Sequence, residues 1–104
     1  DNRISLYVAQ HGACAITKSP LSPDEIHCHH KVPKSLGGGD EYSNLIILRE
    51  RLHRLVHATK QETILELLRE AHLTNQQLSK LNKLRKLAGN EEITFERQLT
   101  PDAN

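Results

Sequence analysis

Two pairs of histidines constrain this chain more than any other feature of its sequence. His29 and His30 are adjacent in the segment HCHHKVP, and neighbouring side chains of an extended strand leave opposite faces of the ribbon. His53 and His57 are four residues apart in ERLHRLVH, so on a helix they lie on one face. A strand and a helix can therefore bring three imidazoles to one metal ion while a fourth takes a proton.

The residues around these histidines predict a hairpin followed by a helix. Pro33 ends the first strand, because proline cannot donate to a ladder. Three consecutive glycines, 37 to 39, permit positive φ and close backbone approach in the following loop. Asn44 precedes the apolar run LIIL, where its amide can fasten the loop to the next strand. The expected elements are a strand at 25–32, a loop at 34–43, a strand at 45–48 and a helix at 49–58.

Five features in register resemble the HNH endonuclease family, also called the ββα-metal or His-Me finger nucleases. They are the His29-His30 pair, the H-x-x-P turn to Pro33, the double glycine, the N-L-x-x-L starting at Asn44, and His53 nine residues after Asn44. Four sequence segments are similar to the C-terminal endonuclease domain of group II intron-encoded reverse transcriptases. They are HCHHKVPKSLGG, DEYSNL, LHRLVHATKQETI and LNKLRKLAG.

The resemblance implies an α+β fold: a small ββα-metal core, made of a β-hairpin and a metal-binding helix, with additional C-terminal helices. By matching to the family, His30 is the general base and Asn44 holds the loop that orients it. The implied metal ligands are His29, His53 and His57. Ligation by His57 stays open, because some family members bind the metal without a histidine at the matching position. Lys31 and Arg54 are candidate phosphate contacts.

The same resemblance implies an activity and its partners. Hydrolysis would leave 5′-phosphate and 3′-hydroxyl ends, and a nick in double-stranded target DNA would prime reverse transcription, with intron RNA and the rest of a reverse transcriptase as further partners. Three imidazoles favour zinc or nickel as a bound ion, whereas the intron enzymes point to Mg²⁺ or Mn²⁺ in catalysis. Two alternatives stay open: a free-standing restriction, homing or bacteriocin-type HNH nuclease, and a non-catalytic metal-stabilised nucleic-acid-binding module.

Composition limits the setting. The 104 residues suit one small domain, and an aromatic content of 3% leaves few platforms on which bases could stack. No stretch is long and apolar enough to cross a bilayer, so a soluble, cytoplasmic protein associated with a bacterial or organellar nucleoid is expected. The net charge is only +1, but residues 27–60 carry six Lys and Arg against three Asp and Glu. This local excess favours a nucleic-acid partner for the histidine segment.

The remaining sequence predicts a single domain built around that core. Residues 4–10 favour a short helix, and residues 11–25 a turn-rich knuckle held by apolar packing. A zinc site of Cys14 and Cys28 completed by His11 or His27 is the less favoured alternative. Thr74 and Gln77 form a capping-box pattern at the start of the last helix. The expected divisions are the knuckle at 1–24, the core at 25–60, helices at 61–90 (63–72 and 74 to Gly89) and a fraying polar tail at 91–104.

One face of the last predicted helix is apolar and the other is cationic. Leucines recur every three residues along it, and four cations occupy the opposite positions, where a solvated surface is favoured over a DNA contact. The leucines are Leu78, Leu81, Leu84 and Leu87, and the cations are Lys80, Lys83, Arg85 and Lys86.

Overall fold

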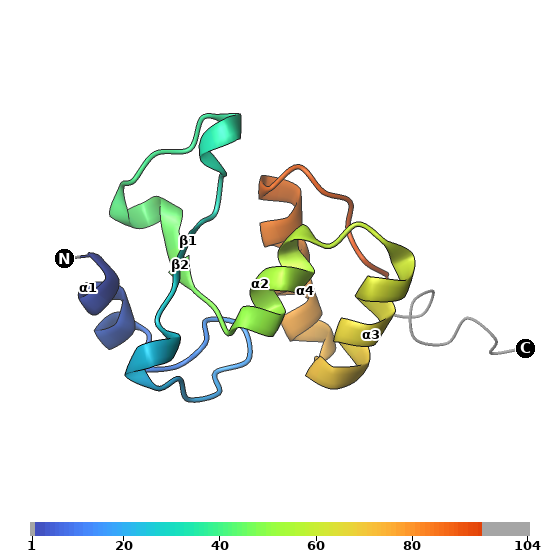
Figure 1. Ribbon diagram of the computed structural model, residues 1–104, viewed down its shortest axis with the longest axis horizontal. Helices are drawn as coiled ribbons and strands as arrows, with labels where there is room; N and C mark the ends of the chain where they lie inside the picture. The colour runs from blue at the N-terminus through green and yellow to red at the C-terminus, as the bar shows by residue number, and fades with distance from the viewer. Residues whose placement is uncertain (1, 95–104) are drawn as a thin grey trace, which may run out of the picture.

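The structure is a computed structural model that describes residues 2–94 (Figure 1). Within these residues the chain forms four helices, one two-stranded hairpin and three short 3-10 turns. The regular elements are α1 (Asn2–Ala9), β1 (Cys28–His30), β2 (Leu45–Ile47), α2 (Glu50–His57), α3 (Gln61–Ala71) and α4 (Asn75–Leu87). The 3-10 turns are η1 (Pro23–Glu25), η2 (Lys34–Leu36) and η3 (Tyr42–Asn44).

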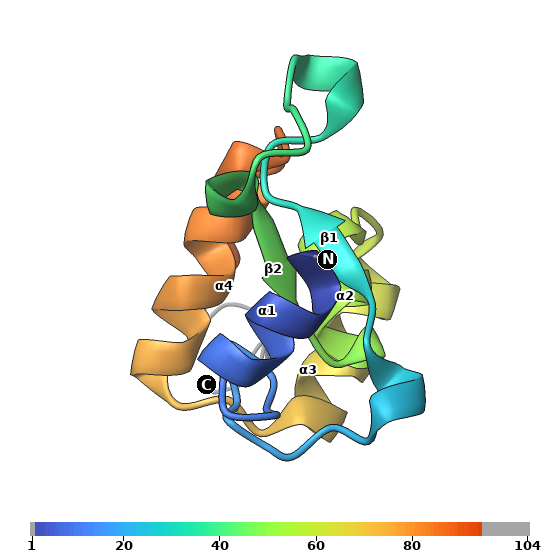
Figure 2. The ribbon, with the colours of Figure 1, turned by 90° about the vertical axis from the view of Figure 1, so that its left-hand side faces the viewer.

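The hairpin is antiparallel and leads directly into α2. Cys28 pairs with Ile47, His29 with Ile46 and His30 with Leu45. The loop between the strands, which contains η2 and η3, projects beyond the hairpin (Figures 1 and 2). A two-stranded antiparallel hairpin followed by a helix, with further helices after it, confirms the predicted α+β class and is consistent with a ββα-metal fold.

The first strand is shorter than predicted, and local hydrogen bonds explain both ends. Ser22 and Glu25 form a capping box that turns 23–25 into a 3-10 helix instead of extended chain. At the other end, both backbone groups of Val32 bond to the side chain of Asn44 and not to the opposite strand. Strand pairing is therefore confined to the three residues that carry the histidines.

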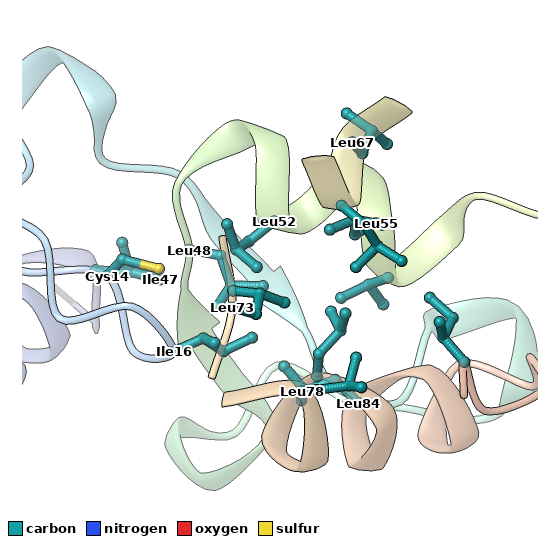
Figure 3. Packing of buried hydrophobic residues seen from close by; sticks show 14 of the residues in the cluster. Cys14, Ile16, Ile47, Leu48, Leu52, Leu55, Leu67, Leu73, Leu78 and Leu84 are labelled. Atoms are coloured by element: carbon teal, nitrogen blue, oxygen red, sulfur yellow. The ribbon is translucent and has the colours of Figure 1, made fainter. Parts of the chain in front are cut away.

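An aliphatic core joins the hairpin to the last three helices. Figure 3 shows Leu52 and Leu55 of α2 facing Leu78 and Leu84 of α4 across this core. The most deeply buried side chains come from β2 and the residue after it, from α2 and α4, and from the knuckle: Ile47, Leu48, Leu52, Leu55, Leu81 and Cys14. Among residues 2–94, no helix is long and apolar enough to cross a membrane.

The structure contains the predicted N-terminal helix, and in the segment after it polar contacts add to apolar packing. Cys14, Ile16 and Leu21 are buried, and Ala13 and Pro20 form an isolated bridge. The Gln10 amide donates to Ile47 O at 3.0 Å and accepts from Ile47 N at 3.1 Å, which ties the knuckle to β2. Both cysteines are free thiols in this structure.

Two assignments on α4 are wrong, and helical geometry explains both. The leucine repeat predicts Leu87 on the core face, but its side chain is 44% exposed. The same pattern predicts Arg85 on the solvated face, but it is only 3% exposed. A residue advances about 100° around an α-helix. Leu87, nine residues after Leu78, therefore lies on the opposite side, while Arg85, seven residues after Leu78, shares its face. The predicted capping box is confirmed, because Gln77 N donates to Thr74 Oγ1 at 3.1 Å and Thr74 N donates to Gln77 Oε1 at 2.9 Å.

The C-terminal region differs from the expectation in two further respects. Helix α3 begins at Gln61, two residues before the predicted start. Ile93, assigned to the polar tail, is buried. The rest of the predicted fraying tail, 95–104, lies outside the described residues.

Candidate active site

Three of the predicted site histidines lie together where β1 meets α2. The ring centroids of His29 and His53 are 3.4 Å apart with the rings nearly parallel, at 16°. The rings of His53 and His57 meet edge to face at 4.8 Å. The strand and the helix therefore gather the imidazoles that the spacing predicted, beside a pocket that His30 and Lys31 also line. The volume of this cavity is about 10 Å³, close to the room that one water molecule requires.

His29 is held in a neutral state by its surroundings. Burial, followed by the neighbouring His53 and the other nearby histidines, lowers the pKa of His29 to about 3. Its Nε2 atom is buried and has no hydrogen-bond partner among the described residues. An unpaired buried nitrogen normally costs free energy, so a ligand for this atom would remove an existing penalty. Burial also lowers the pKa of His53, which keeps its ring neutral as well.

The donor chemistry at this place fits a cation, because neutral imidazole is the form that coordinates metals. However, within residues 2–94 no three His, Cys, Asp or Glu side chains are arranged to hold an ion. The stacking of His29 on His53 accounts for this, since in-plane lone pairs of two parallel rings do not point at a common atom. The fold places the three residues together, rotation of the side chains would be needed to aim them, and ligation stays a prediction.

His30 has a separate environment from its neighbour. Its Nε2 lies 2.7 Å from Oδ1 of Asp40, which Lys34 also contacts at 3.2 Å. The hydrogen bond with His30, and then that with Lys34, lowers the pKa of the Asp40 carboxyl group. An ionised carboxylate only accepts, so His30 Nε2 carries a proton, and in the neutral form of the ring Nδ1 has the free lone pair. This is the tautomer that a general base acting through Nδ1 requires.

Sequence reasoning missed Asp40, although it determines which nitrogen of His30 is free. Asp40 follows the three glycines and is exposed in the loop. No hydrophobic period or ligand spacing marks such a position. The only available signal was an acid at the end of a glycine-rich loop beside a proposed base.

Asn44 fastens the loop that carries Asp40. Its Oδ1 accepts from Val32 N at 2.9 Å, and its Nδ2 donates to Val32 O at 3.1 Å and to Gly39 O at 2.9 Å. Gly38 lies against this cluster, and a Cβ atom there would come within 1.7 Å of Val32 O. Glycine is therefore required at position 38 for close backbone approach. These contacts are what the predicted loop-holding role of Asn44 requires.

The other candidate residues occupy different positions. Lys31 is half-buried beside the pocket, and Arg54 is exposed on α2. His27 stacks on His29 at a longer centroid distance of 6.4 Å. The predicted surface residues His11 and His72 are exposed, as expected.

A buried arginine, also missed by sequence reasoning, holds the end of the helix that carries His53 and His57. Arg85 Nη1 donates to Leu55 O and to Ala58 O, the latter at 2.8 Å, while its Nε donates to Glu91 O at 2.7 Å. Asn90 Nδ2 donates to Val56 O at 2.8 Å. Carbonyls in the last turn of a helix have no intrahelical partner, and here side chains from α4 and the segment after it satisfy them.

Comparison with known proteins finds a similarity over the part of the chain that carries this geometry. The family model for HNH endonuclease matches residues 13–59, a segment that contains every predicted base, ligand and loop residue. Searches of curated proteins and of solved structures found no match. The matched segment ends just after α2, so α3 and α4 lie beyond it. Residues 13–59 are thus similar, in sequence and in their hairpin-plus-helix architecture, to an HNH endonuclease domain, a type of domain associated with nuclease activity.

Proposed function

We propose that this chain is a metal-dependent DNA endonuclease that hydrolyses phosphodiester bonds. One observation carries the proposal: the adjacent residues His29 and His30 line the same pocket in different states. His29 is neutral, with a buried Nε2 that has no partner in the described structure, while His30 is held through Nε2 by Asp40. One residue is suited to a cation and the other to a proton.

His30 acts as the general base in this proposal. With Nε2 donating to the carboxylate of Asp40, Nδ1 accepts the proton of the water that attacks the phosphorus. Histidine is the side chain that most often serves as a general base in enzymes. Asn44 keeps the loop in place so that the base and Asp40 remain in contact.

His29, His53 and His57 would hold one divalent ion beside this base. When bound, the ion would neutralise charge on the scissile phosphate and on the departing 3′-oxygen. Imidazole ligands favour zinc or nickel by affinity, whereas Mg²⁺ prefers oxygen ligands and retained water. We propose Mg²⁺ or Mn²⁺ in catalysis, on the strength of the resemblance to the intron enzymes, with zinc or nickel as ions that the site also binds.

The biological setting that we propose is cleavage of target DNA for reverse transcription by a group II intron. In that setting the chain nicks double-stranded DNA in the cytoplasm or nucleoid, leaves 5′-phosphate and 3′-hydroxyl ends, and works with intron RNA and a reverse transcriptase. This assignment to a group II intron is supported by the amino-acid sequence of the histidine segment and of LNKLRKLAG. A reverse-transcriptase reading frame joined to the gene would support it over a free-standing nuclease.

A nicking assay tests the chemistry. Supercoiled plasmid incubated with the chain and Mg²⁺, Mn²⁺, Zn²⁺ or Ni²⁺ is expected to yield open circles, and chelator is expected to stop the reaction. End labelling should find 5′-phosphate and 3′-hydroxyl groups at the nick. If the chain binds metal but cleaves nothing with any of these ions, the histidines belong to a non-catalytic module and the nuclease proposal is wrong.

A further inference from the structure

We infer that a groove next to the histidine pocket binds the sugar-phosphate backbone of the DNA on one side of the cleaved bond. This inference rests on the proposed function and extends it by naming a surface that holds the substrate. The lysine groove, as we call it, has Lys31, Lys80 and Lys83 at its rim and a floor that includes Ile16, Ile46 and Leu84. Its volume is about 250 Å³.

The groove is continuous with the histidine pocket. Lys31, Ile46 and Leu84 line both of them. A backbone that places one phosphate beside His29 and His30 is therefore led past Lys31 toward the two lysines of α4. Lys80 and Lys83 are three residues apart on that helix and so point to the same side.

The charge of the groove is uncompensated. Three lysines and no acid line it. Within residues 2–94, the side chains of Lys31, Lys80 and Lys83 take part in no ion pair, whereas Lys34 pairs with Asp40 and Lys86 pairs with Glu92. Unpaired lysines on one surface attract phosphates, and the counterions that they displace drive binding.

The side chains on the floor of the groove favour contact with the sugar-phosphate backbone of DNA over contact with its bases. Its side chains are aliphatic and none is aromatic, so it offers no platform for stacked bases. Leu87, which is 44% exposed, completes the apolar surface and can pack against deoxyribose. The solvated face predicted for α4 thus becomes, at positions 80 and 83, part of the substrate surface.

The salt dependence of DNA binding tests this inference without requiring cleavage. The measurement is the affinity of the chain for a short DNA duplex, in chelator, over a series of salt concentrations. The groove variant carries Lys80→Gln and Lys83→Gln. The control variant carries Lys18→Gln and Lys86→Gln, which remove the same charge at two positions that do not line the groove. Thermal unfolding should be unchanged in both, because all four lysines are exposed.

The groove variant is expected to bind about tenfold more weakly, with a log-log salt slope that is shallower by about 2, which is the loss of two phosphate contacts. The control is expected to retain the wild-type slope. An unchanged slope in the groove variant, an equal loss in the control, or no binding of the duplex by the wild type would each overturn the inference. Plasmid nicking by the wild type is measured separately. If the wild type nicks DNA but the groove variant keeps the wild-type salt slope, only the groove inference is wrong. If the groove variant shows the shallower slope but the wild type does not nick DNA, only the nuclease proposal is wrong.

Discussion

In two regions of the molecule an asparagine side chain bonds both the N–H and the C=O of one backbone residue, an arrangement that we call an asparagine clamp. The two clamps serve different purposes. Asn44 holds the N–H and C=O of Val32 at 2.9 and 3.1 Å, and Asn82 holds the N–H and C=O of Ile93 at 2.8 and 2.9 Å. Val32 lies two residues from the proposed base, in the segment that matches the HNH family. Ile93 is buried, in the region beyond the match.

This difference indicates that the two parts of the chain have different structural roles. The first clamp positions polar groups on an exposed loop, where apolar burial cannot do so. The second fixes a buried residue against α4, and Arg85 of the same helix caps the end of α2. The matched segment would supply the chemistry, while the later helices supply the surface against which the histidine-bearing helix packs.

Removal of the proposed base should give the largest effect and should be confined to the chemistry. His30→Ala is expected to lower the nicking rate by about 10² to 10⁴, the usual contribution of a general base. Its free energy of unfolding should stay near that of the wild type, because His30 is only half-buried. Single-turnover nicking and chemical denaturation measure the two quantities. Nicking at the wild-type rate would exclude His30 as the base.

Removal of the buried arginine should act on stability. Arg85→Leu leaves the carbonyls of Leu55 and Ala58 without their donor, so the free energy of unfolding should fall by about 3 kcal/mol. Lys80→Leu, on the exposed side of the same helix, should change it by less than about 0.5 kcal/mol. Urea titration compares the two. Equal stabilities for both variants would show that α4 does not hold the end of α2 in this way.

The two clamps can be compared directly. Asn82→Ala removes two bonds to one backbone residue, and Asn44→Ala removes two such bonds and a third to Gly39 O. Each variant should therefore lose at least about 2 kcal/mol of stability. Only Asn44→Ala should also lose nicking when both are assayed well below their unfolding temperatures. If Asn82→Ala loses as much nicking as Asn44→Ala, then the two regions are not separable.

The smallest expected effect concerns the partner of His30. Asp40→Asn removes the charge that fixes the proton on Nε2 and should slow nicking by about tenfold, since this exposed carboxylate positions the base without reacting itself. Glu41→Gln, the adjacent acid in the same loop, is the control and should be neutral. A neutral Asp40→Asn would mean that the tautomer of His30 is fixed by other contacts.

The parts of the fold that follow from periodicity could be predicted from the sequence. The helical spacing of His53 and His57, the LIIL strand and the Thr74 capping box each express a local rule, and the structure contains all three elements. Strand ends and exposed helix faces depend instead on contacts that periodicity does not encode. Val32 N donates to the side chain of Asn44 and not to the opposite strand. Because the leucine repeat of three is shorter than a helical turn, successive leucines shift around α4, and Leu87 is exposed.

The missed site residues depend on tertiary contacts. Asp40 reaches His30 only because the loop folds back, and Arg85 reaches Leu55 across thirty positions of the chain. Neither contact has a signature in spacing. A buried arginine also contradicts the general expectation that long charged side chains face solvent, so its burial could be recognised only once the open carbonyls of α2 were visible.

The central claim is that the adjacent histidines have different tasks, and metal titration of single variants tests it most directly. Calorimetry with Mn²⁺ and Zn²⁺ would compare alanine variants at positions 29, 30, 53 and 57. The account predicts that His30→Ala binds metal as the wild type does, while His29→Ala, His53→Ala and His57→Ala bind at least about tenfold more weakly. Loss of metal affinity in His30→Ala, or wild-type affinity in His29→Ala, would contradict it.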